Sequence, residues 1–168
     1  MRISSISLAT ALTLLAASTA LYAQRADSQI DARSVALLAS ARAAQAAGNL
    51  DAATDALETA LAVDPRNRAA LIALGEVSLA RGLSGKSIRY YREALVLEPN
   101  DLAALKGQGE ALVAKGAVER ARQNLAKITR ICAKSCPEAV ALSATIAKGP
   151  PAIASVAAKP MPDAAKKE

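Results

Sequence analysis

The chain has 168 residues, a formal net charge of +6, 52% hydrophobic residues and only 2% aromatic residues. It contains no histidine, which removes the commonest general base and a principal ligand of zinc sites. The basic residues are dispersed among acidic ones, which favours a solvated helical surface over a nucleic-acid-binding patch. A composition rich in alanine and leucine suits packed helices and disfavours a sheet. We therefore expect an all-α protein with no bound nucleic acid, small-molecule substrate, cofactor or metal.

The first 23 residues have the organisation of an export signal. One positive charge precedes residues 6–17, which are apolar or small, and two small residues, Ala20 and Ala23, offer possible cleavage points. The alternative is an uncleaved membrane anchor that faces the periplasm, because the uncharged stretch 3–24 is long enough to span a bilayer. We expect cleavage, and hence an exported bacterial protein of the periplasm.

Internal periodicity dominates the chain after a lead-in at residues 24–33. Glycines recur every 34 residues at positions 48, 82 and 116, and Pro65 and Pro99 are separated by the same interval. A fixed period of this length is the signature of helical repeats. It predicts three repeats, which cover residues 34–67, 68–101 and 102–136.

The recurring residues predict the course of each repeat. A first helix ends at Gly48, Gly82 or Gly116, because glycine tolerates the left-handed conformation that follows a helix, and a second helix begins shortly afterwards. A proline ends the second helix of the first two repeats, and an Asn or Asp follows that can cap the next helix. Gly75 and Gly109 allow close packing, and Tyr91 fills a bulky position between helix pairs. One pair cannot bury its apolar face, but three stacked pairs can.

This pattern resembles the tetratricopeptide repeat family over residues 34–133. The second repeat carries the family's signature at Leu71, Leu74, Gly75, Ser78, Ser87, Tyr91, Ala94 and Pro99. The third repeat lacks the proline, and the family's usual tryptophan and most of its aromatic residues are absent. The resemblance implies an α-solenoid of three repeats whose first helices line a concave groove. Such grooves take an extended or helical segment of another protein.

Helical spacing within the first helix of each repeat predicts which side chains face this groove. Besides Ala69 and Ala103, we expect it to be lined by Leu38, Arg42, Gln45, Ile72, Glu76, Leu79, Lys106, Glu110 and Val113. The mixture is apolar, with a few charges of both signs. It departs from the family's basic clamp for a peptide carboxylate, because Ala73, Ala103 and Gly107 stand where some of the clamp's Lys, Arg and Asn residues would be.

The pattern changes beyond the third repeat. Pro137 fits the first turn of a helix and Gly149 its end, so residues 137–149 are predicted to form a capping helix. Residues 150–168 are rich in proline, alanine and lysine and are predicted to be a disordered tail. Cys132 and Cys136 are the only cysteines, and in an exported protein they are expected to form a disulfide. A redox motif, a metal site and free thiols are the alternatives.

Three function classes follow. The first is a non-enzymatic scaffold that binds a partner protein in the groove. The second is an accessory or chaperone-like factor in envelope-complex assembly, secretion or cytochrome maturation, which rests on analogy with exported members of the family. The third is an enzyme that uses Glu76 and Glu110 as a carboxylate pair; solvated groove charges are the preferred interpretation, because no nucleophile–base pair, phosphate loop or metal set accompanies them.

Overall fold

The computed structural model describes residues 29–132 and 136–151. Their secondary structure is entirely helical, which confirms the predicted all-α class. The helices are α2 (Ala32–Ala46), α3 (Leu50–Val63), α4 (Arg68–Ala80), α5 (Ser84–Leu97), α6 (Leu102–Ala114), α7 (Val118–Cys132) and α8 (Pro137–Lys148). The predicted export signal and nearly all of the predicted tail lie outside the described residues. No helix among the described residues is long and apolar enough to cross a bilayer.

Short polar side chains begin the first helix of each repeat. The side chain of Asn67 accepts a hydrogen bond from the backbone N–H of Ala70, and that of Asp101 accepts one from Ala104. Both caps were predicted from the residues that follow the prolines, and each satisfies a donor that the helix itself leaves unpaired. Asp31 caps α2 in the same way, so this helix begins at Ala32, within the stretch that was predicted to be the lead-in.

Glycine ends the first helix of each repeat, as the period predicts. The three equivalent glycines have φ angles of 75°, 74° and 85°, in the left-handed region, where a side chain is strained. Each chain reversal allows the second helix of the repeat to pack against the first. The pairs are α2 with α3, α4 with α5, and α6 with α7.

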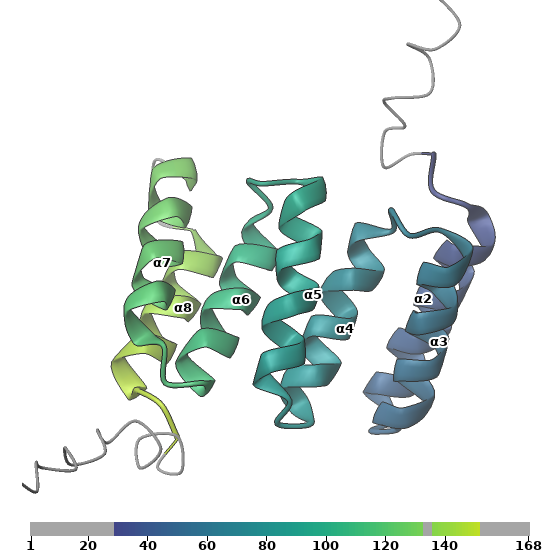
Figure 1. Ribbon diagram of the computed structural model, residues 1–168, viewed down its shortest axis with the longest axis horizontal. Coiled ribbons are helices and arrows are strands. Elements are labelled where there is room, and N and C mark those ends of the chain that lie inside the picture. Colours follow the sequence, from purple (N-terminus) through teal and green to yellow (C-terminus); the bar gives the residue numbers. More distant parts are fainter. Residues whose placement is uncertain (1–28, 133–135, 152–168) are drawn as a thin grey trace, which may run out of the picture.

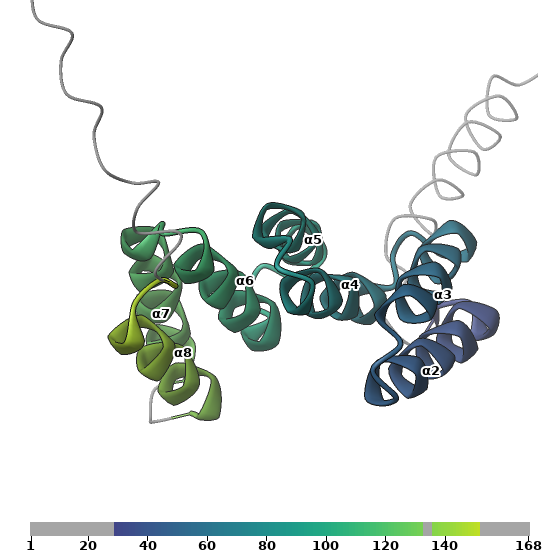
Figure 2. The same ribbon diagram turned by 90° about the horizontal axis from the view of Figure 1, so that it is seen from below.

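The three pairs stack side by side in chain order (Figure 1). Seen from below, α2, α4, α6 and α8 follow the inner side of an arc, and α5 lies on the outer side of α4 (Figure 2). Small residues stand where paired helices approach most closely, since Ala53, Ser87 and Ala121 are all fully buried at equivalent repeat positions. The buried Ser87 hydroxyl donates to the carbonyl of Gly75 at 2.8 Å, so its polar group is satisfied within the core.

The glycines predicted to favour close packing make room for large side chains. A Cβ on Gly75 would lie 2.7 Å from Cζ of Tyr91, and a Cβ on Gly109 would lie 2.6 Å from Cδ2 of Leu142. Gly107, opposite Gly75, also faces the Tyr91 ring. Each glycine therefore accepts a side chain from a neighbouring helix.

Helix α8 covers the end of the array by packing on α6 and α7. It begins at Pro137, as predicted, and its C-cap is Gly149, with a φ angle of 74°. Leu142 is fully buried, and burying a leucine of this kind contributes about 1.5–3 kcal/mol. This helix is the predicted cap. The structure also places Cys132 and Cys136 at bonding distance, with Cα atoms 6.1 Å apart; that this bond forms in the native compartment stays a prediction.

Candidate functional site

The concave face is formed by the first helices of the repeats, α2, α4 and α6, and it continues onto α8 (Figure 2). Most of the side chains that helical spacing assigns to this face have accessible surface. Arg42 and Glu76 are exposed, and the half-buried members are Leu38, Gln45, Leu79, Lys106 and Glu110. Of the two alanines considered beside them, Ala69 is half-buried and Ala103 is exposed.

Ile72 and Val113 differ from this pattern because both are buried, with exposed fractions of 9% and 2%. Val113 belongs to a core cluster with Leu112 and Ala121. Helices α4 and α6 have neighbours on both sides, so part of the face that helical spacing assigns to the groove is covered by the adjacent repeat. These two residues stabilise the array and offer little surface to a partner.

A hollow of about 300 Å³ lies between α4, α6 and α8 on the concave face. Three of its residues come from α8: Pro137, Glu138 and Ala141. The remaining lining residues are Glu76, Tyr91, Ala103 and Lys106. Helical spacing identified Glu76, Ala103 and Lys106, but it missed the contribution of α8. Extending the 34-residue period beyond the third repeat would have indicated that α8 lines the groove, since Pro137 stands one repeat length after Ala103.

We call this site the acidic hollow, because the charged lining residues that have no ion-pair partner among the described side chains are acidic. Lys106 is paired with Glu110 on the same helix, with N and O atoms 3.5 Å apart. Glu76 and Glu138 lie on opposite sides of the hollow and form no ion pair within the described part of the chain. Two carboxylates are therefore left to attract a cation from a ligand.

Tyr91 borders the acidic hollow from α5. Its ring lies between Gly75 and Gly107 and is only 2% exposed. Burial, and then the charges of Glu76 and Glu110, raise the pKa of Tyr91 well above its usual value. The phenol therefore stays protonated and neutral, and the charge of the acidic hollow comes from its other lining residues.

A second hollow, of about 220 Å³, lies between α2 and the start of α4. Val35 and Leu38 give it an apolar character, together with Ile30 and Ala69. Asn67 and Arg68 complete its lining, and Arg68 is held by Asp101 at 3.1 Å. Val35 is half exposed, so this apolar hollow presents hydrophobic surface to solvent.

The two hollows occupy equivalent places in the repeat. Ala103, Lys106 and Pro137 of the acidic hollow stand two repeat lengths after Val35, Leu38 and Ala69 of the apolar hollow. The same position is therefore apolar at one end of the groove and charged at the other. A ligand that filled both hollows would need different side chains at its two ends.

Glu110, one of the two acids considered as a carboxylate pair, is bound to Lys106. Within residues 29–132 and 136–151, no three Cys, Asp or Glu side chains gather as they would around a metal ion. The expectations that the chain binds no metal and carries no catalytic activity stay predictions.

Comparison with known proteins supports this fold. A tetratricopeptide repeat family model matches residues 38–101 and 79–135. No curated protein matches the chain. Among solved structures, an O-GlcNAc transferase mutant of Thermobaculum terrenum is 28% identical with a TM-score of 0.62, over 73% of this chain and 23% of that one. The chain thus spans under a quarter of that enzyme.

Two further structures are similar over most of their own length. The first tetratricopeptide domain of human RPAP3 is 17% identical with a TM-score of 0.62, over 69% of this chain and 94% of that one. The type III secretion chaperone SycD of Yersinia enterocolitica, in complex with a peptide of the translocator YopD, is 20% identical with a TM-score of 0.59. That likeness covers 67% of this chain and 85% of the chaperone.

The fold is a solenoid of helical repeats with an accessible concave face. Within this class, the chain belongs to the tetratricopeptide repeat family. The predicted family and fold are both confirmed.

Proposed function

We propose that the chain is a non-enzymatic scaffold that holds one segment of a partner protein along its concave face. The observation that carries the proposal is the pair of equivalent hollows, one apolar and one acidic. A segment with an apolar side chain at one end and a lysine or arginine at the other fits both. Similar folds support this idea, since the first tetratricopeptide domain of Spaghetti (RPAP3) is described as bound to an HSP90 peptide and SycD as in complex with a YopD peptide.

The electrostatic part of this proposal rests on Glu76 and Glu138. A cation placed between them would approach two carboxylates that form no ion pair with any described side chain. Such partly exposed pairs each contribute roughly 0.2–1 kcal/mol. Together they give about a tenfold preference for a basic segment, which is enough to select among partners that share the same apolar contact.

In-cell crosslinking from Leu79 would identify the bound segment by mass spectrometry, and a synthetic copy of that segment would then be titrated against the purified protein. We expect Glu76→Lys/Glu138→Lys to weaken binding at least tenfold. The matched control is Asp55→Lys/Glu58→Lys, which makes the same change of charge on an exposed face of α3. Equal affinity of both variants for the segment would refute a role for the acidic hollow, and a segment without basic residues would refute the proposed ligand class.

We further propose export to the periplasm of a bacterium, on the strength of the residues 1–23 and the two cysteines. N-terminal sequencing of the protein recovered from the periplasmic fraction would show whether cleavage follows Ala20 or Ala23. Recovery with the membrane, with its first residues intact, would instead establish the anchored alternative.

A narrower role as a chaperone-like assembly factor is the second candidate, and the likeness to a secretion chaperone favours it. The two roles differ in what happens to the partner. A chaperone keeps its client soluble and releases it, whereas a scaffold stays in the finished complex. Following the crosslinked partner in a strain that lacks this protein would separate them: loss of the soluble client indicates a chaperone, and an intact but dispersed partner indicates a scaffold.

A further inference from the structure

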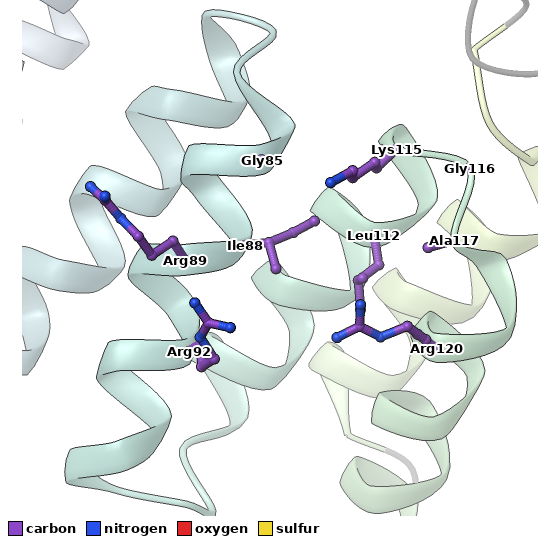
Figure 3. Close-up of a pocket in the computed structure, with 9 residues that line it drawn as sticks. All are labelled: Gly85, Ile88, Arg89, Arg92, Leu112, Lys115, Gly116, Ala117 and Arg120. Atoms are coloured by element: carbon purple, nitrogen blue, oxygen red, sulfur yellow. The ribbon is translucent and has the colours of Figure 1, made fainter. Parts of the chain in front are cut away.

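A basic pocket of about 440 Å³ opens between α5, the end of α6 and the start of α7 (Figure 3). It shares no residue with either hollow of the concave face. Its charged lining residues are all cations: Arg89, Arg92, Lys115 and Arg120. The sequence shows these residues dispersed along 32 positions among acidic ones, and only the stacking of the second and third repeats brings them together.

Three of the four cations are available to a ligand. Arg89 is occupied, because it approaches Glu93 at 3.7 Å and its guanidinium lies 5.0 Å from the centre of the Tyr90 ring. Arg92, Lys115 and Arg120 form no ion pair within the described residues. Figure 3 shows Arg120 extending from α7 toward the side of the pocket where Arg92 lies on α5, with Lys115 reaching over the same gap from the end of α6.

Like charges that converge on a recess repel one another and concentrate positive potential there. A cleft lined by one sign of charge attracts counter-charged ligands far more strongly than dispersed surface charges do. An acidic ligand group would relieve the repulsion and form charge-assisted hydrogen bonds with the two guanidinium groups, which suit carboxylates.

The floor of the basic pocket is apolar. Ile88 is half-buried and Leu112 is buried, and both line the pocket between the cations. A ligand that carried only charge would leave this floor in contact with water. A recess with cations on three different elements also differs from the flat basic face with protruding apolar side chains that suits a bilayer.

We propose that this basic pocket binds an acidic segment of a partner protein, in which Asp or Glu side chains adjoin a leucine or another aliphatic residue. The carboxylates lie between Arg92, Lys115 and Arg120, and the aliphatic side chain contacts Ile88 and Leu112. This surface is separate from the concave face. Binding at the basic pocket therefore leaves the concave face free for the segment of the proposed function.

The test measures binding of a fluorescein-labelled peptide, Glu-Leu-Glu-Asp-Leu-Glu, to the purified protein by fluorescence anisotropy at about 50 mM salt. Arg92→Gln/Arg120→Gln is expected to weaken binding about tenfold. The matched control, Arg130→Gln/Lys148→Gln, removes the same charge from exposed positions outside the pocket and is expected to change the affinity less than about twofold. Replacing both leucines of the peptide with serine should also weaken binding, because the apolar floor loses its contact.

Three results would overturn the proposal. Equal binding of the amide peptide Gln-Leu-Gln-Asn-Leu-Gln would show that charge is irrelevant. Equal weakening by both variants would show attraction to net charge alone. Binding to phosphatidylglycerol vesicles but not to the acidic peptide would make the surface a lipid-binding site.

Discussion

Replacing Gly107 with alanine tests the packing that shapes the acidic hollow. Alanine is the better helix former, and in an unobstructed helix this change stabilises by about 1 kcal/mol. In α6, however, the new Cβ would lie 2.5 Å from Cε1 of Tyr91, against an ordinary contact of 3.4 Å or more. The ring would have to retreat by about 1 Å, and Gly75 stands on its other side at a comparably close distance.

The gain in helix propensity and the cost of overpacking oppose each other, and their magnitudes decide whether Gly107→Ala stabilises or destabilises the protein. Overpacking a filled core costs about 1–3 kcal/mol, and a ring held from both sides belongs at the upper end of this range. Subtracting the gain in helix propensity leaves a net destabilisation of about 2 kcal/mol. For an ordered region of this size, the loss corresponds to a fall in melting temperature of about 5–10 °C.

Urea unfolding followed by circular dichroism would measure this change, with Gly85→Ala as the control. Gly85 also lies in a helix, but nothing lies within 4 Å of its Cβ position, so its replacement should leave stability unchanged or raise it by up to about 1 kcal/mol. In a Tyr91→Leu background the penalty for Gly107→Ala should disappear. A Gly107→Ala variant as stable as Gly85→Ala would refute the packing argument.

Three further predictions concern the caps, the cysteines and pH. Gly82→Ala should lower the free energy of unfolding by about 1–2 kcal/mol, because its φ angle is 74°, and Gly82→Asn should cost less; equal stability of both would contradict this. Cys132 and Cys136 of the exported protein should resist alkylation until reduced, and reduction should cost at most about 2 kcal/mol, since the closed loop is short; ready labelling of the untreated protein would exclude the disulfide. The raised pKa of Tyr91 means that the unfolded state loses the phenol proton first, from about pH 10. The contribution of the protonated Tyr91 phenol to stability is therefore fully present below pH 10 and is lost as the pH rises above 10. Between about pH 9 and pH 11, the denaturation midpoint of Tyr91→Phe should fall less than that of the unsubstituted protein.

Much of the concave face was predictable, and its exceptions have a common cause. Leu38, Glu76 and Lys106, which helical spacing assigned to this face, line the hollows, and their contact with a partner stays a prediction. Ile72 and Val113 do not line them, because the extent of coverage by the next repeat is not contained in the spacing of a single helix. The contribution of α8 to the acidic hollow was missed because that helix was interpreted only as a cap.

The sequence by itself determined the features that arise within one repeat. Helix ends follow from Asn67, Asp101 and the glycines with left-handed backbone, because capping and φ preferences act over a few residues. The 34-residue period then determined the number of repeats and their family.

Only the tertiary structure decided how charges group. Glu76 and Glu138 line one hollow and Arg92 and Arg120 line one pocket, although the two members of each pair lie on different helices far apart in the sequence. Such grouping depends on the packing of whole helices, which is set by the fit of buried side chains such as Tyr91 between Gly75 and Gly107. A chain whose charges look evenly mixed in sequence therefore acquires an acidic inner hollow and a basic pocket elsewhere on its surface when its repeats stack.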